Sequence, residues 1–134
     1  MNAGTSVLAV PGPAGRIGVA LDVPQAAGPA RAVAVIAHPH PLFGGTRDNK
    51  VVQTLGKTFF ALGYAAVRFN FRGVGQSAGT FDEGVGETED ALAALAHAQQ
   101  ELGAELPVVL AGFSFGSFVQ TRVAQRIAAL RLVL

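Results

Sequence analysis

The sequence predicts an α/β fold with a mostly parallel sheet and helices on both faces. Apolar runs occur at residues 32–37 and 108–111, as in strands buried on both sides, and residues 65–71, where Arg68 and Asn70 interrupt the apolar residues, are a further strand candidate. A segment with apolar residues at helical spacing follows each run. Repeated strand–helix units of this kind form parallel sheets through right-handed crossovers.

The first elements depart from that repeat. Residues 6–10 and 17–23 are short strand candidates, and the segment at 11–15 contains two Pro and two Gly. This segment reads as a turn, so we expect an N-terminal antiparallel hairpin. The Ala-, Gly- and Pro-rich stretch at 24–29 is expected to connect the hairpin to the first central strand.

Three helices are expected after the central strands. The first runs from about Asp48 to Leu62, and the second runs from about Gly86 to Leu102 with acidic residues in its first turns, where the helix dipole favours them. In the third, apolar residues recur at helical spacing with polar residues such as Gln120 between them; the apolar positions are Val119, Val123, Ile127 and Leu130. The last residues, 131–134, begin like another buried strand.

Composition excludes several classes of function. The chain has 134 residues, enough for one domain, and its net charge of +1 gives no basis for binding nucleic acid or an anionic membrane. Cysteine is absent, which rules out a thiol nucleophile and a disulfide framework. No apolar run reaches the length of a membrane span, and no secretion signal is evident, so a cytoplasmic protein is expected.

A serine at a strand–helix junction is the main candidate for chemistry. Ser114 follows the apolar run at 108–111 and precedes the third helix, with Gly112 and Gly116 two residues away on either side. In this context G-x-S-x-G is typical of a nucleophile elbow, a tight turn that exposes the serine hydroxyl. The alternative is a serine that caps the helix, with glycines required only for packing. The flanking strand and helix favour Ser114 as the catalytic nucleophile.

Two further loops, at 38–45 and 72–77, leave the carboxyl ends of predicted strands, where parallel sheets place their sites. Acyl transfer through a serine needs N–H donors for the oxyanion. One donor is expected from Phe115, the residue after the serine. In the loop at 38–45, Pro39 and Pro41 have no N–H, so the second donor is expected from His40.

The other candidate sites are weaker. His38 is expected to shape its loop, and His97 to lie on a solvated helix surface. A metal site at His38 and His40 would lack a third ligand. The G-x-G-x-x-A pattern at 73–78 is not followed by a helix, so it does not predict a nucleotide. No cofactor and no metal are therefore expected.

Together the motifs resemble those of the α/β-hydrolase superfamily. They are His38-Pro39-His40-Pro41 with Gly44-Gly45, Asp48-Asn49-Lys50, Asn70-x-Arg72-Gly73-x-Gly75-x-Ser77 and Gly112-x-Ser114-x-Gly116. The resemblance is nearest to the dienelactone-hydrolase-like branch of predicted esterases with an HPHP loop. It implies the α/β-hydrolase fold and a carboxylesterase-like serine hydrolase that cleaves an ester or related acyl bond of a small molecule. In many relatives the third residue of this loop gives an oxyanion N–H, which here is His40.

After Ser114 the sequence departs from that superfamily. The superfamily's triad continues with an acid and then a histidine, but residues 115–134 contain no Asp, Glu or His. We therefore expect residues 1–134 to be the N-terminal portion of one α/β-hydrolase domain, truncated after the strand that follows the elbow helix and inactive alone. The alternatives are a non-catalytic binding protein of the same fold and an inactive truncated fragment. A final strand at an open sheet edge would favour aggregation or a homodimer.

Overall fold

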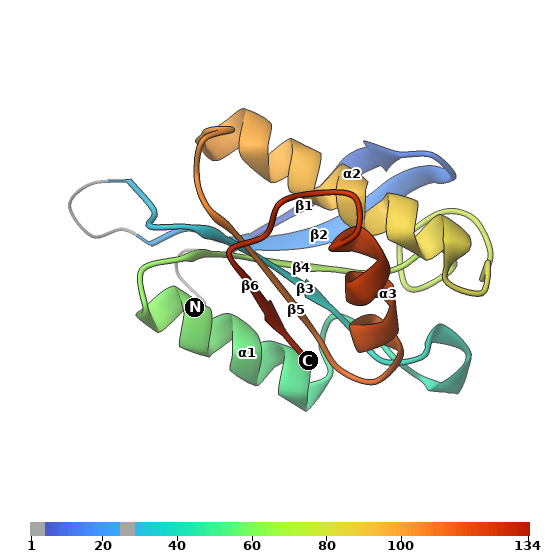
Figure 1. The fold of residues 1–134 in the computed structure, drawn as a ribbon. Helices are drawn as coiled ribbons and strands as arrows, with labels where there is room; N and C mark the ends of the chain where they lie inside the picture. Colours follow the sequence, from blue (N-terminus) through green and yellow to red (C-terminus); the bar gives the residue numbers. More distant parts are fainter. Residues whose placement is uncertain (1–4, 25–28) are drawn as a thin grey trace.

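The computed structural model describes residues 5–24 and 29–134, and it forms one mixed sheet with helices on both sides (Figure 1). The strands are β1 (Thr5–Gly12), β2 (Gly15–Asp22), β3 (Val33–Ala37), β4 (Ala65–Phe69), β5 (Val108–Gly112) and β6 (Arg131–Val133). Their spatial order is β1-β2-β4-β3-β5-β6. Strands β4, β3, β5 and β6 run parallel, whereas β2 pairs antiparallel with both β1 and β4. The expected fold class is therefore confirmed.

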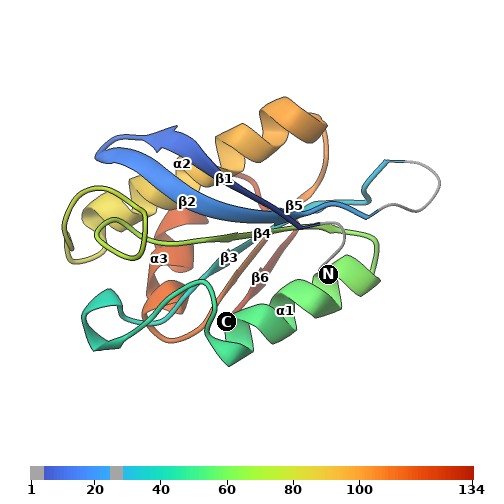
Figure 2. The same cartoon turned by 180° about the vertical axis from the view of Figure 1, so that it is seen from behind.

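Helix α1 (Lys50–Ala61) lies on one side of the sheet, and α2 (Val85–Leu102) and α3 (Phe115–Val123) lie on the other (Figures 1 and 2). Helix α1 begins two residues later than predicted, because the Asn49 side chain accepts hydrogen bonds from the N–H groups of Val51 and Val52 and so caps the helix. None of the helices in the described part of the chain is long and apolar enough to cross a membrane.

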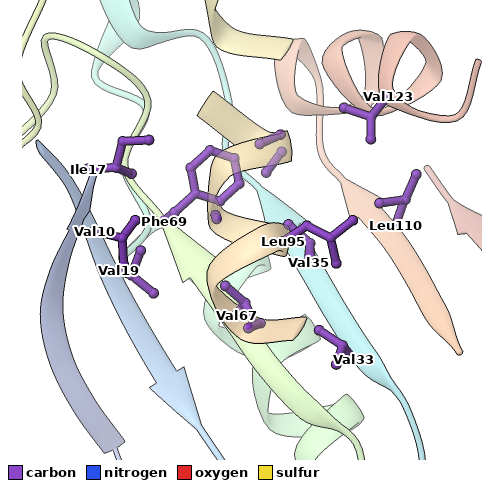
Figure 3. Close-up of a cluster of buried hydrophobic side chains, with 14 of the residues drawn as sticks. Val10, Ile17, Val19, Val33, Val35, Val67, Phe69, Leu95, Leu110 and Val123 are labelled. Carbon is purple, nitrogen blue, oxygen red and sulfur yellow. The ribbon is translucent and has the colours of Figure 1, made fainter. Parts of the chain in front are cut away.

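Two apolar clusters hold these layers together. The larger lies between the sheet and helices α2 and α3, where strand residues such as Val35 and Phe69 pack with Leu95 and Val123 (Figure 3). The smaller includes Ile36, Val52 and Phe59 and holds α1 against the central strands. Because both faces of β3, β4 and β5 are covered, all residues of these strands are buried, as the apolar runs of β3 and β5 predict; in β4 this includes Arg68.

Several boundaries differ from the prediction. The hairpin turn is only two residues long, because Pro11 pairs with Arg16 and Gly12 pairs with Gly15 within the ladder. The predicted connection at 24–29 falls mostly at residues 25–28, outside the described residues.

Helix α3 also differs, since it ends at Val123 and does not continue through Ile127 and Leu130. The chain turns there to bring β6 beside β5, and the N–H of Leu130 donates to the carbonyl of Val108 at 2.7 Å. Gln120, which the spacing placed among the polar residues of this helix, is fully buried. Its Nε2 donates to the carbonyls of Val35 and Ala111, at 2.9 and 3.0 Å.

Candidate active site

Ser114 lies at the junction of β5 and α3, two residues after the strand ends and one before the helix begins. Its backbone has φ 60° and ψ −120°, and only Glu83 among the other described non-glycine residues also has a positive φ. A non-glycine residue in such a conformation costs on the order of 1–3 kcal/mol, and such residues cluster at functional sites. The position is the tight strand–helix turn that the sequence predicts.

The two flanking glycines are required by close backbone contacts. A Cβ on Gly116 would lie 2.1 Å from the carbonyl oxygen of Ala37, at the end of β3. A Cβ on Gly112 would lie 2.6 Å from the backbone of Gly116. Neither neighbour can move aside as a flexible side chain could, so only glycine fits at both positions. The turn is therefore clamped between β5, α3 and the end of β3.

The Ser114 side chain does not cap its helix. It makes no capping hydrogen bond, and the residue is exposed. The alternative that explained Ser114 as a helix cap therefore lacks the contact it requires. An exposed hydroxyl on a strained turn is the arrangement expected of a serine nucleophile.

Backbone N–H groups near Ser114 are left without acceptors. In the first turn of α3, Gly116 donates to the Phe113 carbonyl, and Ser117 and Phe118 both donate to the Ser114 carbonyl. The N–H of Phe115 has no hydrogen-bond acceptor within residues 5–24 and 29–134, and the same is true of His40. Free N–H groups are a requirement for binding an oxyanion.

His40 packs directly against the elbow. Its ring centroid lies 4.9 Å from the ring of Phe115 and 4.9 Å from the ring of Phe81, and it also contacts Phe43 at 4.8 Å. Its Nδ1 accepts from the Leu42 N–H at 3.2 Å. Ring contacts on several sides and this hydrogen bond fix the conformation of the loop, so the structure brings His40 and Phe115 together.

His38 has a different role, because its imidazole is buried and both nitrogens are engaged. Nε2 accepts from the Phe71 N–H at 3.1 Å, so Nδ1 carries the proton and donates to the Pro39 carbonyl at 2.7 Å. Burial lowers the pKa of His38 to about 4, and the hydrogen bond to Pro39 opposes this shift. The ring is therefore a neutral link between the loops after β3 and β4.

The loop between β4 and α2 is held by buried charges that the sequence analysis did not identify. Arg72 donates from its backbone N–H and Nε to Asp90 Oδ2, at 2.9 and 3.1 Å, and from Nη2 to Oδ1 at 2.9 Å. The hydrogen bond to Asp90 raises the pKa of Arg72. Glu87, also buried, accepts from the N–H groups of Asp82 and Gly84. Glu87 and Asp90 lie three residues apart, on the same face of α2. This spacing was the feature of the sequence that could have indicated that the two acids are buried together.

In the part of the chain that the structure describes, Ser114 has no hydrogen bond to a side chain that could act as its base. No side chain there hydrogen-bonds to Ser114, and both nitrogens of His38 are used within the fold. His97 lies on α2, half-buried beside β1, and not on a fully solvated surface as predicted. The described residues thus present an exposed serine and free backbone N–H groups, with no side chain hydrogen-bonded to the serine.

A comparison with protein-family models identifies the superfamily of this chain. A model described as X-Pro dipeptidyl-peptidase (S15 family) matches residues 15–134. The chain belongs to this family of α/β-hydrolases. The α/β-hydrolase resemblance is therefore confirmed, while the narrower assignment to an HPHP-loop branch stays a prediction.

Similar solved structures agree with this assignment. The chain is 37% identical to an α/β serine hydrolase without a lid from Xanthomonas campestris, with a TM-score of 0.89. The match includes 96% of this chain and 59% of that protein. It is 42% identical to an α/β serine hydrolase homologue from Coxiella burnetii, with a TM-score of 0.88, over 95% of this chain and 60% of that one. An uncharacterised protein of Rickettsia prowazekii is 43% identical over 76% of this chain and 43% of its own length. This chain spans between 43% and 60% of the length of each of these relatives.

Proposed function

We propose that this chain carries the nucleophile and oxyanion-binding part of a serine esterase that cleaves an ester or related acyl bond of a small molecule. The observation that carries the proposal is Ser114, which is exposed, uncapped and held at φ 60° between β5 and α3. Similarity to proteins described as α/β serine hydrolases supports the reaction class. No cofactor is part of the proposal.

In this mechanism, the Ser114 oxygen attacks the carbonyl carbon of the substrate and its proton passes to a base. The carbonyl oxygen becomes an oxyanion, which would accept hydrogen bonds from the N–H groups of His40 and Phe115. Collapse of this intermediate releases the alcohol, which takes up the proton, and leaves an acyl group on Ser114. Water then hydrolyses the acyl-enzyme and releases the acid.

The base and the acid of the triad would come from sequence other than these 134 residues. Residues 115–134 contain no Asp, Glu or His, and serine is a weak nucleophile at neutral pH without an imidazole partner. Losing triad members typically removes several orders of magnitude of rate. We therefore expect the 134-residue chain to be nearly inactive by itself.

The test is to label the 134-residue chain, and any longer protein encoded by the reading frame that contains it, with a fluorophosphonate and to assay p-nitrophenyl butyrate. In the longer protein, Ser114→Ala should abolish labelling and lower turnover by about a thousandfold or more. The matched control is Ser117→Ala, three residues after Ser114 in the chain. This variant should retain both labelling and turnover. Labelling that survives Ser114→Ala would contradict the assignment of the nucleophile.

The proposal includes a homodimer formed at the free edge of β6. Its residues are exposed, with Leu132 at 41% and Val133 at 38%, and among the described strands β6 is hydrogen-bonded only to β5. An exposed apolar edge strand pairs readily with a second copy. Light scattering should detect a dimer or larger species of the chain, and Leu132→Lys should shift it to the monomer. A monomeric 134-residue chain without the substitution would contradict this part of the proposal.

A further inference from the structure

A pocket lies over β1 and β2, on the sheet face opposite helices α2 and α3. Ile17 and Val19 belong to the apolar cluster under α2, so the alternating residues Arg16 and Gly18 face the other way. Helix α1 covers that face only over β3, β4 and β5. The pocket has a volume of about 290 Å³, and the side chains at its wall include Val7, Ala9, Arg16, Arg47 and Gln76.

Two guanidinium groups face this pocket without a carboxylate partner. A Cβ on Gly18 would lie 3.0 Å from Arg47 Nη1, so the Arg47 side chain lies directly over this glycine. Arg16, two residues before Gly18, donates from Nε to the Gln76 carbonyl at 2.7 Å. Neither arginine forms an ion pair with any described residue, and residues 1–4 and 25–28 contain no Asp or Glu.

Neighbouring polar residues hold the backbone of Arg47 in place. Arg68, on the neighbouring strand β4, is buried, and its Nε has no partner in the described part of the chain. Its Nη1 donates to the Arg47 carbonyl at 3.0 Å and to Asp48 Oδ1 at 3.3 Å. Asn70 accepts from the Arg47 N–H at 2.9 Å. The Arg47 backbone is thus held by Arg68 and Asn70, and Asp48 forms its ion pair with Arg68, not with the two arginines of the pocket.

We propose that this pocket binds an organic anion. A carboxylate or phosphate group would lie between the side chains of Arg16 and Arg47, because a guanidinium binds such oxygens through paired, charge-assisted hydrogen bonds. A short apolar chain on the anion would cover Val7, which is 69% exposed, and Ala9. The proposal does not depend on Ser114, since the pocket contains none of the residues of the proposed active site.

The test is to titrate the chain with sodium hexanoate, sodium acetate and inorganic phosphate, followed by the backbone amide signals of β1 and β2. Hexanoate should shift the Gly18 and Ala9 signals with saturation, and acetate should bind more weakly because it lacks the chain. Tighter binding of phosphate than of acetate would identify phosphate as the preferred headgroup, and weaker binding would identify carboxylate; both results support an anion site. No saturable shift with any of the three anions would overturn the proposal.

Substitutions separate this site from general attraction of anions. Arg16→Gln, at an exposed position that should fold normally, should weaken hexanoate binding about tenfold. Gly18→Ala should weaken it without changing charge, because its Cβ would displace the Arg47 guanidinium. Arg131→Gln removes the same charge from β6, where the Arg131 side chain donates to the adjacent Leu130 carbonyl, and should leave binding unchanged. Equal loss in Arg131→Gln and Arg16→Gln would overturn the site.

Discussion

Two strand-to-helix connections at the carboxyl end of the sheet are stabilised in opposite ways. The β5–α3 connection contains only Phe113 and Ser114, and the Ser114 side chain makes no hydrogen bond to a described residue. The β4–α2 connection runs over residues 70–84, and buried carboxylates on α2 accept hydrogen bonds from it. The short connection is held by backbone packing, whereas the long one is held by charge-assisted hydrogen bonds.

The difference shows how a strained, exposed serine can be kept in place. A buried side-chain network around Ser114 would engage the hydroxyl, so the short connection is fixed by its glycines against β3 instead. The long connection supports it from outside, since Phe81 packs against His40 at 4.9 Å and against Phe115 at 5.7 Å. Rigidity is thus supplied by groups that make no hydrogen bond to the Ser114 side chain.

The largest expected effect is on the short connection. Gly116→Ala would place a Cβ 2.1 Å from the Ala37 carbonyl oxygen, and relief requires α3 to move away from β3. We expect the free energy of unfolding to fall by about 4 kcal/mol, measured by urea denaturation. Ser117→Ala, the next residue in α3, should change it by less than about 0.5 kcal/mol. A stable Gly116→Ala chain would show that backbone packing does not hold the elbow.

The second effect concerns the long connection. Asp90→Ala would leave the largely buried Arg72 guanidinium without its carboxylate, with 13% of the arginine side chain and 1% of the Asp90 side chain exposed. Breaking a buried pair in this way should cost about 3 kcal/mol of unfolding free energy. The neighbouring Glu89→Ala breaks the exposed pair with Arg126 and should cost less than about 1 kcal/mol. Equal losses in the two variants would contradict the comparison.

The sequence predicted the short connection far better than the long one. The elbow follows from local features, namely an apolar run, two glycines around Ser114 and a helix, and the structure has each of them in place. Glu87 and Asp90 were explained by the helix dipole alone; their spacing puts them on one face of α2, but only the tertiary structure shows that Asp90 is buried against Arg72. The early end of α3 was missed for a similar reason, since its helical spacing continues while pairing of β6 with β5 turns the chain.

A third prediction tests His38, which joins the loops after β3 and β4. Its pKa is lowered to about 4 in the folded chain, so the unfolded chain binds more protons between this value and the ordinary pKa of about 6.5. Stability is therefore fully present above the unfolded pKa and is lost as the pH falls toward the folded pKa. We expect the unfolding free energy to fall by about 2 kcal/mol between about pH 7 and pH 4.5.

Urea denaturation across that pH range measures this effect, and His97→Gln serves as its control. His97→Gln removes an imidazole that lies on α2, outside the loops that His38 joins, so a change common to both variants would not be specific to His38. His38→Gln should flatten the dependence as well as lower stability, because it removes the titrating group. An unchanged slope in His38→Gln would assign the effect to carboxylates elsewhere.

The smallest effect tests the contact between the two connections. Phe81→Leu keeps most of the apolar volume but loses the ring contacts with His40 and Phe115. We expect a loss of about 1 kcal/mol in unfolding free energy. Hydrogen exchange at the Leu42 N–H, which donates to His40 Nδ1, should also become faster, since the His40 ring loses one of its packing partners. Phe60→Leu, a matched change on α1 outside the ring contacts around His40, should leave that exchange rate unchanged. If both variants accelerate Leu42 exchange equally, the long connection does not position the loop that carries His40.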